Sequence, residues 1–152
     1  VNHRARMWTA EQADRTLSAL AGSVDLVICK GLDARDVFGC TGDPREVAHR
    51  LQDRFQAPAV ACTWGRDPAT LLDGDTWVEC GSYDVEIVDR IGAGDAFAAG
   101  VLWGHLDGSL PLGLQRGVAM AALKMTVRGD LLTLDRAAVT ALLGPTVGDV
   151  TR

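Results

Sequence analysis

The sequence predicts an α/β fold, a sheet with helices on both of its faces. Two apolar runs, "VDLVIC" at residues 24–29 and "APAVACTW" at 57–64, are typical of buried strands. Segments with helix start signals stand around them, and the chain ends in helical segments. The 152 residues, 47% hydrophobic and 23% charged, suggest one domain over residues 1–152.

The first half of the chain carries two helix start signals. Thr9 followed by Gln12 has the spacing of a capping box, which predicts a helix closed by Gly22. Residues 30–39 are expected to form a loop with a short helix. Asp43 with Pro44 after it predicts a further helix up to residue 55.

The second half begins with a hairpin signal. Residues 69–80 alternate around Asp73-Gly74-Asp75, and residues 83–89, "YDVEIVD", are expected to supply one more strand. From Asp95 an apolar helix rich in Ala and Gly is predicted, buried on most of its sides. Residues 110–127 and 134–144 predict two more helices.

The composition limits the classes of partner and compartment. A net charge of −5 and a pI near 5.0 offer no basic face, so we expect no nucleic-acid partner, whereas a phosphorylated small molecule is compatible. The sequence shows no apolar run of membrane-spanning length and no signal peptide. We therefore expect a cytoplasmic protein without a membrane partner. The four cysteines form no C-x-x-C pair, which favours buried thiols in a reducing compartment over a zinc site.

The stretch "VDRIGAGDAFAAG" at residues 88–100 indicates phosphate chemistry. A strand expected to end at Asp89 leads through Gly92-Ala93-Gly94 to a helix expected to start at Asp95. Glycine amides and a helix N-terminus form an anion site, and a carboxylate beside it can take an alcohol proton during phosphoryl transfer. The alternative is a glycine turn with Asp95 as a simple N-cap. A dinucleotide fingerprint fits worse, because G-x-G-x-x-G is absent.

These residues resemble the C-terminal signature D-T-x-G-A-G-D-x-F-x-x-G of the ribokinase-like (PfkB) carbohydrate kinases. The matching positions are Asp89, Gly92, Ala93, Gly94, Asp95, Phe97 and Gly100. The resemblance implies a three-layer αβα fold, ATP and Mg²⁺ as cofactors, Asp95 as the catalytic base and the amides of Gly92 to Asp95 as the anion hole. Arg90 replaces the usual Thr, as in 2-keto-3-deoxygluconate kinases, and we place Arg90 among the substrate-binding residues.

Two further stretches resemble ligand-binding segments of that subgroup. "VNHRARMW" is similar to its D-x-N-x-R-x-x-L-W segment, which implies that Asn2 and Arg4 reach nucleotide phosphate and that Arg4 also holds the sugar acid. The alternative is a solvated Arg4 near a chain end. "KMTVRGD" is similar to a segment ending in Gly-Asp, which implies that Asp130 contacts a sugar hydroxyl; alternatively Gly129-Asp130 is a simple turn.

Two other stretches match the family less completely. "CTWGRDPATLL" is similar to the T-x-G-x-x-G segment beside the nucleotide, which assigns Thr63, Gly65 and Asp67 to cofactor binding, although Pro68 replaces the second glycine. Residues 30–33 align with N-x-x-E, so Asp33 is expected to serve Mg²⁺ through water. Lys30 stands in place of Asn, where it holds phosphate directly or weakens metal binding.

The resemblance runs from Asn2 to about Leu143 and covers the C-terminal portion of a sugar kinase. Because the chain opens at Val1 inside a motif, we expect a piece of a longer kinase, without the small lid sheet and inactive alone. The missing half or another chain would then be a partner, and the complete kinase a homo-oligomer. Alternatives are a kinase for fructose, ribose or a nucleoside, or a non-catalytic nucleotide-binding scaffold.

Overall fold

The structure, a computed structural model, describes residues 1–133 and 135–143. The chain divides into two compact units, Val1–Gly81 and a second unit that begins at Ser82. The single domain expected over residues 1–152 stays a prediction. No helix within the described ranges is long and apolar enough to cross a membrane.

The first unit is built on a four-stranded sheet in the order β1-β2-β3-β4. β1 (Leu26–Lys30) pairs in parallel with β2 (Ala59–Trp64), which confirms the two buried strands that the apolar runs predict. β3 (Asp67–Asp73) and β4 (Thr76–Cys80) follow as antiparallel neighbours. The predicted hairpin is therefore confirmed, and the tight turn between β3 and β4 uses a glycine in left-handed conformation, Gly74 with φ of 55°.

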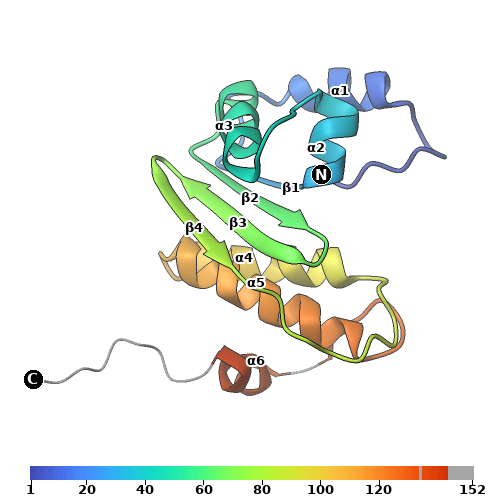
Figure 1. The fold of residues 1–152 in the computed structure, drawn as a ribbon, viewed down its shortest axis with the longest axis vertical. Helices are drawn as coiled ribbons and strands as arrows, with labels where there is room; N and C mark the ends of the chain where they lie inside the picture. The colour runs from blue at the N-terminus through green and yellow to red at the C-terminus, as the bar shows by residue number, and fades with distance from the viewer. Residues whose placement is uncertain (134, 144–152) are drawn as a thin grey trace, which may run out of the picture. The chain divides into compact units, whose positions relative to one another are not determined.

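Three helices, α1 (Ala10–Ser18), α2 (Gly31–Phe38) and α3 (Pro44–Phe55), lie together over one face of this sheet (Figure 1). Both expected N-terminal signals are confirmed, because full capping boxes begin α1 and α3. The predicted closure of the first helix at Gly22 is wrong, since α1 ends at Ser18. The N–H of Gly22 donates instead to the carbonyl of Phe55, at 2.8 Å, so this glycine serves a contact with the end of α3.

The core of the first unit fills the space between these helices and the sheet. Phe38 and Phe55 meet edge to face, with ring centroids 5.2 Å apart, and Leu51 is fully buried between its neighbours. Three thiols lie in the same core, those of Cys29, Cys40 and Cys62.

The second unit contains α4 (Ala93–Leu106), α5 (Leu110–Met125) and α6 (Arg136–Leu143), and α4 and α5 lie side by side (Figure 1). All three helices were expected, although residues 134 and 144 of the last one lie outside the described residues. The burial expected on most sides of α4 is found only in part: Leu102 and Leu106 are 47% and 83% exposed.

Glycines bring α4 and α5 close together. A Cβ on Gly100 would lie 2.4 Å from the backbone nitrogen of Gly117, and one on Gly104 would lie 2.1 Å from Cα of Gly113. Both distances are far below van der Waals contact, so the two backbones touch where any larger residue would separate them. The Gly100 of the sequence signature therefore has a packing role between helices.

The strand expected over residues 83–89 is not formed, which corrects the prediction. Most of this segment is exposed, and no strand of the described chain pairs with it. The N–H groups of Val88 and Asp89 both donate to the carbonyl of Met125, at 2.8 and 3.1 Å, so the segment ends against the last residue of α5. Alternation alone cannot make a strand when no neighbouring strand accepts its hydrogen bonds.

Candidate functional site

The turn at Gly92 forms an open helix N-terminus. α4 begins at Ala93, two residues earlier than expected, because Gly92 with φ of 80° serves as its N-cap. No side chain in the part of the chain that the structure describes caps this helix. Within the described chain, the N–H groups of Gly94 and Asp95 have no acceptor. A Cβ on Gly94 would meet no atom within 4 Å, so these amides are open to an approaching anion.

Asp95 lies in the first turn of α4 with an exposed side chain. Its carboxylate makes no hydrogen bond and no ion pair to a described residue, so the side chain is open to a ligand. The turn therefore places one open carboxylate beside two open amides. A phosphate group fits this donor set, because helix N-terminal amides supply both hydrogen bonds and partial positive charge.

Asp89 holds this turn in place and ties it to the segment that ends at Asp130. Its Oδ1 accepts the N–H of Ile91 and its Oδ2 accepts the N–H of Gly129, both at 3.0 Å. These two N–H groups, the first more than the second, lower the pKa of Asp89 below its usual value of 3.8. A Cβ on Gly92 would lie 2.3 Å from the backbone oxygen of Asp130, so two predicted site residues meet here.

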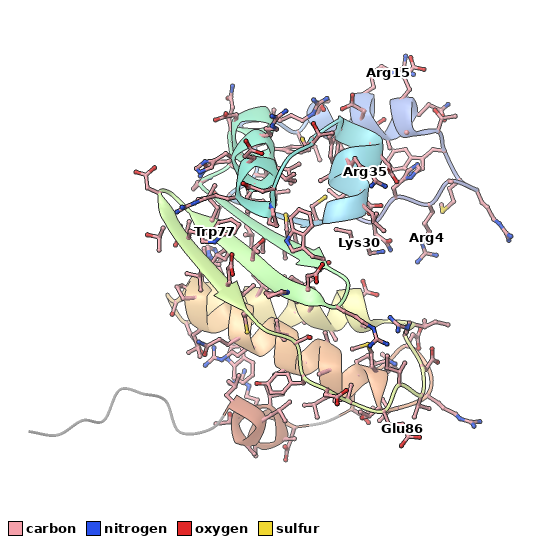
Figure 2. The ribbon with its side chains drawn as sticks, in the orientation of Figure 1. Arg4, Arg15, Lys30, Arg35, Trp77 and Glu86 are labelled. Carbon is pink, nitrogen blue, oxygen red and sulfur yellow. The ribbon has the colours of Figure 1, made fainter. Side chains whose placement is uncertain are left out.

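A second group of predicted site residues gathers at the start of α2, in the first unit. Lys30 ends β1 and donates from Nζ to Oδ1 of Asn2, at 2.8 Å. The N–H of His3 donates to Oδ2 of Asp33, in the first turn of α2, at 3.1 Å. The segment that bears Asn2 is thus joined to β1 and α2. Figure 2 shows the side chain of Arg4 reaching away from the ribbon, and Arg4 is exposed.

The start of α2 offers one carboxylate, that of Asp33, as a possible ligand for a magnesium ion. Among residues 1–133 and 135–143, no three His, Cys, Asp or Glu side chains gather as metal ligands. Oδ1 of Asp33 makes no hydrogen bond to a described residue. Mg²⁺ keeps several waters and is commonly held by one or two carboxylates together with substrate phosphates, so a single open carboxylate oxygen fits this ion.

The remaining predicted residues lie around the turn between β2 and β3. Thr63 is half-buried at the end of β2, opposite Lys30 on the neighbouring strand. Gly65, with φ of 77°, makes the turn, and Asp67 begins β3 with its side chain exposed. Beside them opens a pocket of about 270 Å³. It is lined by Pro44, Trp64, Asp67, Pro68, Thr70 and Glu79.

Trp64 organises this region, although the sequence pattern assigned no role to it. Its Nε1 donates to the hydroxyl of Thr70, at 3.0 Å, and its ring lies so close to Gly31 that a Cβ there would be 2.2 Å from the ring. Reasoning from the sequence also missed the bridging contacts of Asp89. The available signal was its place in the signature, three residues before the glycine turn.

Comparison with known proteins shows which protein family the chain belongs to. The profile of the pfkB family of carbohydrate kinases matches residues 1–136, which include every predicted site residue. The chain belongs to the pfkB family of carbohydrate kinases. This pfkB-family chain is 34% identical over 132 residues to a 2-dehydro-3-deoxygalactonokinase of Haloferax volcanii, covering 86% of the chain and 42% of the relative. It is 50% identical over 135 residues to a 2-dehydro-3-deoxygluconokinase of Bacillus subtilis, covering 86% and 40%.

A solved structure agrees with this assignment. The crystal structure of a 2-dehydro-3-deoxygluconokinase from Thermotoga maritima superposes with a TM-score of 0.86 and 26% identity, over 95% of the pfkB-family chain and 49% of the other. The likeness confirms the predicted ribokinase-like α/β class. The chain spans about two fifths of the length of the curated relatives it matches.

Proposed function

We propose that this chain carries the ATP-binding and catalytic part of a kinase that phosphorylates a hydroxyl of a sugar acid, 2-keto-3-deoxygluconate. The observation that carries the proposal is the open N-terminus of α4, where Asp95 stands beside amides without acceptors. The relatives named as 2-dehydro-3-deoxy sugar-acid kinases support this substrate class. For the intact protein we propose a cytoplasmic location.

The chemistry follows from the two kinds of group at this turn. ATP with Mg²⁺, when bound, supplies the γ-phosphoryl group. Asp95 takes the proton of the sugar hydroxyl, whose oxygen forms the new bond to phosphorus while the bond to ADP breaks. The amides of Gly92 to Asp95 stabilise the negative charge on the transferred group. Neither role needs a rearrangement of α4, because the Asp95 carboxylate and the open amides both lie in its first turn.

Each of the other predicted residues has a role toward one of two ligands, the nucleotide with its Mg²⁺ or the sugar acid. Asn2, Thr63, Gly65 and Asp67 contact the nucleotide, and Asp33 serves Mg²⁺ through water. Arg4 has the chemistry to hold a carboxylate or phosphate through two parallel hydrogen bonds, and its exposed side chain is free for this. Arg90 and Asp130 bind the sugar acid. Further sugar contacts would come from another part of the polypeptide or from another chain, and a homo-oligomer is proposed for the complete kinase.

A nucleotide-binding protein without catalysis is the second candidate. The observation that favours it is Lys30, which replaces the Asn of the family motif and whose ammonium engages Oδ1 of Asn2. A weakened Mg²⁺ site would result if this pair stayed closed. The intact Asp95 argues for the kinase, because a scaffold has no use for a proton acceptor at that position.

The decisive variant is Asp95→Asn, in the protein produced from its natural reading frame. We expect sugar-dependent ADP release to fall by about 10²-fold or more, because an amide cannot take the hydroxyl proton. ATP binding, measured by calorimetry, should stay near that of the parent because the anion hole is backbone. The matched control is Asp84→Asn, an exposed aspartate outside the turn.

Substrates should be compared in the same assay. We expect 2-keto-3-deoxygluconate to support turnover better than fructose, ribose or a nucleoside. Parental turnover in Asp95→Asn would contradict the role of Asp95. A parent that binds ATP but transfers phosphate to none of these acceptors would instead favour the non-catalytic candidate.

A further inference from the structure

Lys124 is a fully buried cation that the proposed chemistry does not use. It lies in the last turn of α5 with 0% of its surface exposed, and its Nζ donates to the carbonyl of Val127, at 3.1 Å. A lysine is almost never fully buried unless its charge is compensated. The end of α5 offers such compensation, because the carbonyls of a helix C-terminus carry partial negative charge.

The residues around Lys124 join two segments that are far apart in the sequence. We call residues 88–92 and 124–130 together the joint. Met125 accepts the N–H groups of Val88 and Asp89, and Asp89 in turn accepts the N–H of Gly129. At the far end of the joint, Gly92 packs on the backbone of Asp130 without room for a Cβ.

The two segments of the joint carry opposite charges. Asp89 belongs to the segment that leads into α4, and Lys124 belongs to the segment that leads to Asp130. The positive charge of Lys124 stabilises the ionised form of Asp89, adding to the larger effects of the Ile91 and Gly129 amides. Each charge also fixes backbone: Asp89 holds two N–H groups, and Lys124 holds one carbonyl.

We propose that Asp89 and Lys124 are positioning residues that hold the open turn of α4 and Asp130 in one fixed arrangement. This inference rests on the proposed function, because it takes the turn as the phosphate site and Asp130 as a sugar contact. The two ligands of a phosphoryl transfer must be aligned closely, and a displacement of about 1 Å can cost roughly 10²-fold in rate. With both charges in place, Asp89 and Lys124 keep that alignment without themselves contacting either ligand.

Asp89→Asn tests the joint with almost no change of side-chain volume. A carboxylate can accept both N–H groups, whereas an amide offers one oxygen and turns an NH₂ group toward the other N–H. We expect hydrogen exchange at the amide of Ile91 or Gly129 to become faster by about tenfold or more, as the loss of a hydrogen bond to a charged group predicts. Asp84→Asn, the same chemical change on an exposed side chain outside the joint, should leave both amides unchanged.

Kinetics supply the second readout. In the protein produced from its natural reading frame, Asp89→Asn should lower kcat by about 10-fold to 10²-fold with little change in the KM for ATP, because alignment is lost and the binding amides remain. Lys124→Met keeps the length of the side chain and removes its charge. We expect the same split between kcat and KM, with the melting temperature measured alongside to show that the variant is folded.

The exchange measurement tests the joint independently of turnover. Unchanged exchange at both amides in Asp89→Asn would overturn the inference, and so would a parental kcat in that variant. A parent protein without any sugar-dependent turnover would contradict the proposed function, yet faster exchange in Asp89→Asn would still establish the joint. If Lys124→Met does not fold, the exchange and the kcat of Asp89→Asn are sufficient to support or overturn the inference.

Discussion

At the scale of single residues, Asp89 shows how one carboxylate can join two segments of backbone. Its two oxygens each accept one backbone N–H, from Ile91 two residues ahead and from Gly129 forty residues ahead. The first contact shapes the turn that leads to Gly92. The second fixes the neighbouring segment, so a local turn and a distant segment depend on the same ionised side chain.

This arrangement predicts a pH dependence at Asp89. Because the pKa of Asp89 is lowered in the folded protein, its contribution to stability is present above its usual value of 3.8 and is lost as the pH falls through the lower folded value. We expect a carboxyl NMR titration to give a midpoint below 3.8, and the Gly129 amide to lose protection over the same range. A midpoint at or above 3.8 would contradict the two hydrogen bonds.

At the scale of elements, the pair α4 and α5 depends on glycine. Gly100 faces Gly117, and Gly104 faces Gly113, at distances that leave no space for a Cβ. The close approach lets dispersion contacts form along both helices. It also sets the position of the start of α4, where the open amides lie.

Gly100→Ala should therefore destabilise the second unit, although alanine favours helix formation. A Cβ would have to push backbone atoms apart, which costs about 1–3 kcal/mol or more. We expect hydrogen exchange in α4 and α5 to become faster and the urea midpoint of the second unit to fall. The control is Gly81→Ala, since a Cβ there would meet no atom within 4 Å. An unchanged midpoint in Gly100→Ala would contradict this expectation, because it would mean that α4 and α5 move apart at little cost in free energy.

At the scale of the whole molecule, an acidic chain of two units carries the predicted site residues in both units. Val1–Gly81 presents Asn2, Lys30 and Asp33 at the start of α2, and the second unit presents the open turn of α4. Each group is supported by hydrogen bonds within its own unit. Residues proposed for the reaction are found in each of the two units.

Thiol reactivity should report on the folding of the first unit. Burial raises the pKa of Cys29 to about 12 and also raises that of Cys62, so neither forms a reactive thiolate at a pH of about 8. Cys80 is half-buried and Cys40 is buried. We expect iodoacetamide to modify Cys80 first in the native protein and all four thiols after denaturation, as followed by mass spectrometry. Rapid native modification of Cys62 would show that the core opens readily.

The sequence by itself determined the elements whose signals are local. The capping box at Thr9, the helix start at Asp43 and Pro44 and the hairpin at Gly74 depend on residues within a few positions of one another, so the printed sequence was enough to predict them. The signature at residues 89–100 likewise identified the family, which the profile match then established. The role of Asp95 in the reaction stays a prediction.

Only the tertiary structure decided what depends on distant partners. Residues 83–89 alternate like a strand, but no strand within residues 1–133 and 135–143 pairs with them, and Gly22 contacts Phe55 where a helix end was expected. The contacts of Val88 and Asp89 with Met125, the neighbour of the buried Lys124, depend on how the end of α5 meets the segment before α4. Hydrogen bonds and burial are satisfied by whichever group lies nearby in space, and for these residues that group is tens of positions away in the chain.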